Sequence, residues 1–167
     1  NEFRRSSYYL TCDRVNGVLT VYTDSTMRIP IKTIRVSVGK AGTETPTGTW
    51  TMHRAGRWQE LMGPSWGQYG THVVNGIFVH SVACGQANSY NLPVGEYLRL
   101  GNPASHGCIR ACVADAKWVW DNCNGSKIHI FDGTYTSNEA LKGPLGRKAL
   151  TPLRGSKNFD PTDPACK

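Results

Sequence analysis

The sequence predicts a mostly β domain with one main helix. Two stretches rich in β-branched and aromatic residues, 7–15 and 18–23, flank the pair Asn16-Gly17, which is typical of a tight hairpin. Only 113–123 has the composition of a longer helix. The chain has 167 residues, so we expect a single domain over 1–167.

Further strands are predicted along the chain. Alternation of apolar and polar residues indicates a half-buried strand at 28–39. Another strand is expected at 48–53, a hairpin at 71–80 and a last strand at 127–131. The segment 54–70 is too irregular for a helix, and its tryptophans and tyrosine either line a substrate cleft or pack in the core and loops: Trp58, Trp66 and Tyr69.

The charge of the chain favours anionic surroundings. The formal net charge is +7 at pH 7, which suits wall polymers, membrane surfaces or nucleic acid. The basic residues are scattered and the aromatic residues follow no RNA-binding pattern, so nucleic acid is disfavoured as a partner. No apolar run approaches the roughly 18 residues of a membrane span, and the first five residues are not those of a signal peptide.

The stretch 103–110 holds the residues best suited to catalysis. Cys108 directly follows Gly107 and lies two residues after His106. An imidazole can take the proton of a thiol, and small residues leave backbone N–H groups uncovered. The residue types therefore indicate a nucleophilic cysteine, although many cysteines and histidines are only buried structural residues.

Four stretches give this chain a resemblance to a known family. The sequence Ser-His-Gly-Cys-Ile-Arg at 105–110 resembles the signature of YkuD-type L,D-transpeptidase catalytic domains. In the same order as in that family, 45–50 resembles its early loop and strand, 77–81 its strand with the catalytic histidine, and 115–120 the helix after the signature. The resemblance covers about 8–131, and 132–167 is a C-terminal extension without a counterpart.

The resemblance implies a fold and an activity. The fold would be a YkuD-like β-sandwich of two mixed sheets with one main α-helix. The activity would be peptidoglycan cross-linking through a cysteine acyl-enzyme, with release of D-alanine from tetrapeptide stems and with neither cofactor nor metal. The partners would be stem peptides, and anionic cell-wall polymers are compatible with the basic charge. We expect a monomer that works outside the cytoplasmic membrane, with an export segment or anchor absent from this chain.

The resemblance also implies the role of each site residue. Cys108 is the nucleophile and His80 its base, with the carbonyl of Ser81 holding the imidazole. The backbone N–H groups of Gly107 and Cys108 form the oxyanion hole, and His106 orients the loop or the substrate. The loop at 40–47 supports the active-site region or is a plain connection.

Two residues of the signature carry open alternatives. Ser105 contacts substrate or is a plain loop hydroxyl. Arg110 holds the loop or the carboxylate of the acceptor, or forms a surface ion pair. The other histidines lie in predicted strands without a motif, where we expect ordinary strand residues: His53, His72 and His129.

The separation of the two motifs is longer than is usual in the family. His80 and Cys108 lie 28 residues apart, so 83–102 resembles an insertion. It forms a lid, a substrate-selecting wall or an inert surface loop. In the C-terminal extension, residues 141–153 are candidates for packing on the domain.

Three other functions fit parts of the pattern. A zinc site would use His106, Cys108 and Cys112 with Cys84 or Cys123, although the chain lacks a Cys-x-x-Cys pair. A non-catalytic wall-binding module would keep the basic surface without needing the thiol. An L,D-carboxypeptidase would use the same acyl-enzyme with water as the acceptor.

The cysteine count constrains the disulfides. An exported protein with six cysteines suggests three bridges, but a nucleophilic Cys108 has to stay unbridged. At most two bridges then form among the other five, and the loop-rich ends at Cys12 and Cys166 are expected users. Cys112 and Cys123 lie at opposite ends of the predicted helix, about 16 Å apart, too far to join each other.

Overall fold

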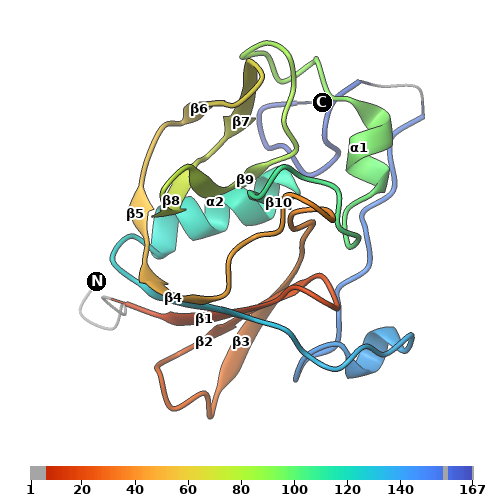
Figure 1. Ribbon diagram of the computed structural model, residues 1–167. Helices are drawn as coiled ribbons and strands as arrows, with labels where there is room; N and C mark the ends of the chain where they lie inside the picture. Colours follow the sequence, from red (N-terminus) through yellow and green to blue (C-terminus); the bar gives the residue numbers. More distant parts are fainter. Residues whose placement is uncertain (1–6, 156–157, 167) are drawn as a thin grey trace.

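The computed structural model describes residues 7–155 and 158–166, and its β-strands form two mixed sheets with a helix packed beside them (Figure 1). The strands are β1 (Tyr9–Asp13), β2 (Val18–Tyr22), β3 (Pro30–Arg35), β4 (Gly48–Thr51), β5 (His53–Arg54), β6 (Trp58–Leu61), β7 (Ser65–Gln68), β8 (Thr71–Val74), β9 (Ile77–Ser81), β10 (Ile109–Ala111) and β11 (Lys127–Phe131). The helices are α1 (Val94–Leu98), α2 (Val113–Asn122) and the 3₁₀-helix η1 (Glu139–Leu141).

The larger sheet has five strands in the order β3-β2-β1-β11-β4. β1 and β11 run parallel, and the other neighbours are antiparallel. The predicted β1–β2 hairpin is confirmed, but its connection spans 14–17 and is longer than a two-residue turn. The reason is Asp13, whose Oδ1 accepts the N–H groups of Val15 and Asn16 at 2.9 and 3.2 Å and folds the connection into a wider loop.

The second sheet has the order β10-β9-β8-β5, with β9 and β10 parallel, and β6 and β7 form a separate two-stranded hairpin. The predicted mostly β fold of two mixed sheets and one main helix is therefore confirmed. The strand expected at 48–53 is divided at Met52, whose side chain is fully buried. The part before Met52, β4, belongs to the larger sheet, and the part after it, β5, belongs to the second sheet. The strand expected at 28–39 also ends early, at Arg35.

One apolar core joins the two sheets and α2. Leu10 and Ile128 of the larger sheet, Val79 and Ile109 of the second sheet, and Val119 of α2 are all at most 1% exposed. α2 starts where the sequence predicts and ends one residue earlier. A buried core that is shared in this way fixes the two sheets relative to each other.

The segment 83–102 and the C-terminal extension pack against each other. Tyr97 of α1 is fully buried in a second cluster, on which Leu150 and Leu153 of the extension pack. The predicted packing of 141–153 is confirmed for these two leucines, whereas Leu141 and Leu145 are 67% and 50% exposed. Figure 1 shows the extension running beside α1. Among the described residues, no helix has the length and apolar character needed to cross a membrane.

Candidate active site

The parallel pairing of β9 and β10 brings the two chemical motifs together. Arg110 on β10 is in register with His80 on β9, and Cys108 lies just before β10. Cys108, two positions before Arg110, therefore lies beside β9 close to His80, although 28 positions separate the two residues in the chain. Such proximity between distant residues is what a parallel pair provides.

The loop that carries Cys108 is held by the early loop of the chain. Thr45 is fully buried, and its hydroxyl donates to the carbonyl of Gly107 at 2.6 Å while accepting the N–H of Gly39 at 2.9 Å. The hydroxyl of Thr43 donates to the carbonyl of Ser105 at 3.0 Å. The loop at 40–47 therefore supports the signature and is more than a connection.

Residues just after β3 complete this support. Ser37 and Arg110 exchange both backbone hydrogen bonds at 2.9 Å, and the N–H of Lys40 donates to the carbonyl of Ser105 at 3.0 Å. The strand predicted at 28–39 ends early because 36–40 leave the larger sheet to pair with the signature.

Within the signature, Ser105 closes the loop on itself. Its hydroxyl is buried, accepts the N–H of Gly107 at 3.1 Å and donates to the carbonyl of Cys108 at 2.5 Å. The loop-hydroxyl alternative for Ser105 is therefore present in the structure, and because Ser105 also lines the cavity of Cys108, its contact with substrate stays a prediction. The N–H of Gly107, expected in an oxyanion hole, is occupied by this hydroxyl, and a φ of 126° at Gly107 suits glycine.

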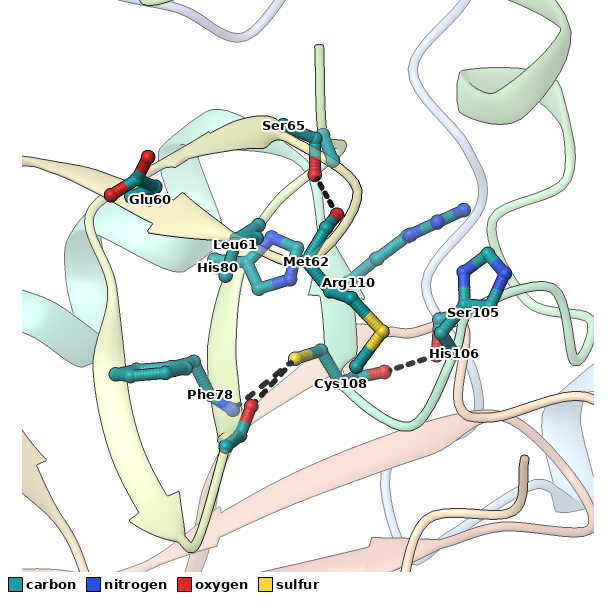
Figure 2. A pocket seen from close by; sticks show the side chains of 12 residues that line it. Glu60, Leu61, Met62, Ser65, Phe78, His80, Ser105, His106, Cys108 and Arg110 are labelled. Atoms are coloured by element: carbon teal, nitrogen blue, oxygen red, sulfur yellow. Dashed lines mark hydrogen bonds between the residues drawn. The ribbon is translucent and has the colours of Figure 1, made fainter. Parts of the chain in front are cut away.

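The thiol of Cys108 faces the end of the β8–β9 turn. Its sulfur accepts the N–H of Phe78 and donates to the carbonyl of Gly76, both at 3.5 Å (Figure 2). Burial raises the pKa of this thiol, while the N–H of Phe78 and the charge of Arg110 lower it to a smaller extent. Cys108 is therefore a neutral thiol at rest, and no hydrogen bond among the described residues joins it to His80.

His80 is held as a neutral imidazole. It is 1% exposed, and its Nδ1–H donates to the carbonyl of Ser81. Burial lowers its pKa to about 4, against a smaller opposing effect of the Ser81 carbonyl. The expected holding contact of Ser81 is thus present, and Nε2 is the nitrogen left for a proton transfer.

Cys108 and His80 line one cavity of about 220 Å³. Its other walls come from the β6–β7 hairpin, the turn before β9 and the signature, and include Glu60, Leu61, Met62, Ser65, Phe78, Ser105, His106 and Arg110. Figure 2 shows the side chain of Met62 extending from the hairpin toward Cys108. Of the predicted site residues, Ser81 and Gly107 do not line this cavity. They contact residues that do, Ser81 through the imidazole of His80 and Gly107 through the hydroxyl of Ser105.

A second cavity adjoins the first. It shares five lining residues with the first cavity, and residues of 83–102 such as Asn91 and Leu92 form its other side. The shared residues are Met62, Ser65, Ala83, His106 and Arg110. The segment 83–102 is therefore a wall of this second cavity and not an inert surface loop. His106 is an exposed residue at the rim that both cavities share.

The side chain of Arg110 does not reach into open space. Its Nη1 donates to Glu96 of α1 at 2.8 Å, and the side chain is 12% exposed. Of the roles that the sequence left open for Arg110, the structure shows an ion pair, and its partner Glu96 belongs to the segment 83–102. Its backbone also holds the loop through Ser37.

The comparison with known proteins decides the family. A family model described as "L,D-transpeptidase catalytic domain", of the YkuD family, matches residues 7–139. The chain belongs to this family. The Putative L,D-transpeptidase YciB of Bacillus subtilis is 59% identical over 27 residues, which are 16% of this chain and 14% of that protein.

Solved L,D-transpeptidases share the fold. The L,D-transpeptidase of Mycobacterium smegmatis has a TM-score of 0.56 at 21% identity, over 75% of this chain and 58% of its own. An L,D-transpeptidase of Mycobacterium tuberculosis has a TM-score of 0.59 at 19% identity, over the same shares of the two chains. This chain thus spans less than two thirds of the length of either structure.

Other predicted features of this L,D-transpeptidase domain lie away from the site. Tyr69 is buried and packs edge-on against Trp120 of α2, with ring centroids 5.4 Å apart, so the proposed aromatic cleft is wrong for this residue. Trp58 and Trp66 are absent from the walls of the first cavity. The histidines outside the motifs make local contacts, His72 with Asn75 and His129 with Thr49.

The alternative zinc site does not come together. Cys112 and Cys123 flank α2 at opposite ends, as predicted, and the described residues contain no group of three or more side chains placed to hold a metal ion. All six cysteines are free thiols. Cys12 lies inside β1 and is fully buried, so its description as a loop-rich end is wrong. That Cys108 stays unbridged in the active protein remains a prediction.

Several residues of the site were missed by the sequence reasoning. Gly67 and Gln68 of β7 contact His80 and Ser81, and Met62 and Gly76 face Cys108. An isolated glycine within a strand often marks a close backbone approach, so Gly67 carried a usable signal. Gly76 lies in the turn of the hairpin that the sequence predicts, which does not indicate its contact with the thiol, and Gln68 and Met62 carry no signal in a single sequence.

Proposed function

We propose that this domain is a peptidoglycan L,D-transpeptidase that works through an acyl-enzyme on Cys108. The single observation that carries the proposal is one cavity lined by the Cys108 thiol and by a buried His80 whose Nδ1 is bound to Ser81. Cys108 attacks the carbonyl of the diamino-acid residue in a tetrapeptide stem, and the terminal D-alanine leaves. An amine of a second stem then takes the acyl group.

The resting charges favour proton transfer during the attack. Cys108 and His80 are both neutral near pH 7, because burial raises the pKa of the thiol and lowers that of the imidazole to about 4. The sulfur turns from Gly76 toward Nε2 of His80, gives up its proton as the C–S bond forms, and the imidazolium returns that proton to the nitrogen of the departing D-alanine. The acceptor amine then gives its proton to Nε2, and the thiol regains it when the acyl group leaves.

The oxyanion of this reaction needs backbone donors. The N–H of Cys108 is one expected donor. The N–H of Gly107 becomes a second donor when the Ser105 hydroxyl moves off it. Arg110 stays paired with Glu96 and lowers the pKa of Cys108 from inside the wall.

Two adjoining cavities favour transpeptidation over hydrolysis. A transfer between two stems needs a place for each stem, whereas water needs none. Cys108 lines the first cavity, and the second cavity adjoins it through shared walls that include Met62, His106 and Arg110. We propose that one stem occupies each cavity, that the protein acts as a monomer outside the cytoplasmic membrane, and that its basic surface lies against anionic wall polymers.

Product analysis tests this function. The domain is incubated with stem tetrapeptides that differ in their diamino acid, and the products are identified by mass spectrometry. Transpeptidation releases D-alanine and gives a cross-linked dimer, while release with only tripeptide would mean a carboxypeptidase. Binding to cell walls without any turnover would favour a wall-binding module.

Matched variants assign the thiol. Cys108→Ala should abolish D-alanine release, and Cys112→Ala, four residues away in the same part of the chain, should retain it. The Cys112 thiol is a suitable control because burial and the neighbouring Asp115 raise its pKa to about 11. Turnover retained by Cys108→Ala would exclude the proposed nucleophile.

A further inference from the structure

The last part of the chain caps α2. Its N-cap residue, Cys112, makes no capping hydrogen bond with its side chain. The first helical N–H groups are instead bound by the C-terminal segment: Asp160 Oδ2 accepts from Val113 at 2.9 Å, and Thr162 Oγ1 accepts from Ala114 at 3.1 Å. Unpaired N–H groups at a helix start need such partners, so the segment 158–166 has a fixed place on the domain.

From this place the segment reaches the strand β7. Asp163 is 3% exposed, and its Oδ2 accepts from Nε2 of Gln68 at 3.0 Å. On its other side, Gln68 accepts from Nη1 of Arg57 at 2.8 Å. The Gln68 side chain is thus held at both of its polar atoms, and Asp163 is the partner that lies beyond the matched residues 7–139.

The strand β7 in turn positions His80. The backbone N–H of Gln68 donates to the hydroxyl of Ser81 at 2.8 Å, and the carbonyl of Ser81 accepts Nδ1–H of His80. Gly67 packs directly on the imidazole, since a Cβ there would lie 2.6 Å from Nδ1. Two consecutive residues of β7 therefore fix the position and the orientation of the imidazole ring: Gly67 by direct packing, and Gln68 through Ser81.

We infer that Asp163 is a positioning residue for His80, acting through Gln68 and Ser81. All four side chains are at most 5% exposed, so the hydrogen bonds between them are shielded from water. Without Asp163 a buried amide of Gln68 loses its acceptor, and β7 shifts to find another. Small displacements of a catalytic group cost rate steeply. The inference rests on the proposed function only in taking His80 as the base of Cys108.

A double-mutant cycle tests the inference. The rate of Cys108 alkylation by iodoacetamide is measured against pH for Asp163→Ala in the wild-type and in the His80→Ala backgrounds. Near neutral pH we expect a loss of about tenfold in the wild-type background and no further loss in His80→Ala. At high pH, where thiolate forms without help, the loss should disappear.

Two further variants keep the result interpretable. Thr162→Val removes a cap of α2 from the same segment without touching Gln68, and should keep the wild-type pH profile. Asp163→Asn keeps the volume of the side chain but has a single acceptor oxygen, so it retains the contact with Gln68 or the contact with the N–H of Ala165, but not both. It replaces Asp163→Ala in the measurements if the alanine variant does not fold. An equal loss in both His80 backgrounds would mean general loosening and would overturn the inference.

The ring nitrogens of His80 give a readout that does not depend on catalysis. In ¹⁵N NMR spectra, Asp163→Ala should shift the His80 resonances away from the Nδ1–H form, while Thr162→Val should leave them in place. Unchanged resonances together with an unchanged alkylation rate would overturn the inference. Shifted resonances in a domain that does not turn over stems would support the inference while the proposed function fails.

Discussion

Gly67 lies against the imidazole of His80 so closely that no side chain fits between them. A Cβ at Gly67 would come within 2.6 Å of Nδ1 and 2.9 Å of Cγ. Such approaches do not occur between packed atoms, so any larger residue moves either β7 or the ring. The glycine is therefore required by space and not by its backbone angles.

We expect Gly67→Ala to impair the site more than the fold. The added methyl group turns His80 away from Ser81, and Cys108 alkylation near neutral pH should fall at least about tenfold. Gly95→Ala is the control, because a Cβ at Gly95 of α1 meets nothing within 4 Å and alanine favours a helix. Wild-type alkylation in Gly67→Ala would contradict the packing described for β7.

The buried neutral His80 makes stability depend on pH. Its pKa is about 4 when folded and 6.5 for a histidine exposed to water, so between these pH values the unfolded chain binds a proton that the folded chain does not. The free energy of unfolding should therefore fall as the pH drops from 6.5 to 4, by up to about 3 kcal/mol.

Denaturant unfolding at pH 7, 6 and 5 measures this dependence. His80→Gln removes the titrating group, so its stability should vary less with pH than that of the wild type, while the other groups contribute equally to both. Identical pH slopes for the two proteins would show that His80 is not held neutral by burial.

The ion pair of Glu96 with Arg110 influences the pKa of the Cys108 thiol. Arg110 lowers the pKa of Cys108, and Glu96 offsets its charge at 2.8 Å. Glu96→Gln should lower the thiol pKa and raise the alkylation rate at pH 7 by about twofold to threefold, an effect that salt reduces because Glu96 is partly exposed.

Glu139→Gln is the matched control for this charge change. Glu139 pairs with Arg147 and Arg35 outside the walls of the two cavities, so its substitution should leave the alkylation rate unchanged. A slower reaction in Glu96→Gln would mean that α1 acts on the site through packing and not through charge.

Thr45 ties the early loop to the signature. Valine at this position keeps the shape but loses the hydroxyl contacts with Gly107 and Gly39, so Thr45→Val should cost about 2 kcal/mol of unfolding free energy and lower the turnover. Thr47 of the same loop is exposed, and Thr47→Val should change neither quantity by much. Thermal unfolding and stem turnover measured in parallel check both expectations.

Local patterns predicted the parts of the fold that are local in the chain. The hairpins around Gly17 and Gly76 depend on adjacent residues, and α2 on its own composition. The resemblance of the motifs then identified His80 and Cys108 as candidate site residues, because each lies at a fixed position within its motif. The meeting of the two follows from the parallel pairing of β9 and β10, which the family fold implies.

Contacts between distant segments could not be predicted in the same way. Asp163 and Gln68 are 95 positions apart, and neither lies in a motif. The ion-pair partner of Arg110, Glu96, lies in the five-residue helix α1, a stretch for which the sequence indicated only a short strand or helix near 97–100. The sequence left open whether the Ser105 hydroxyl contacts substrate or the loop, and the hydrogen bonds with Gly107 and Cys108 follow from the demand of buried N–H and carbonyl groups for partners.

The identity of the acylated residue is the most direct test of the proposed mechanism. The domain is mixed briefly with stem tetrapeptide, quenched in acid and mapped by peptide mass spectrometry. The prediction is an adduct equal to the stem minus D-alanine on the peptide that contains Cys108, absent from Cys108→Ala and reduced in His80→Ala. An adduct on another residue, or one that survives in Cys108→Ala, would contradict the assignment of Cys108 as the nucleophile.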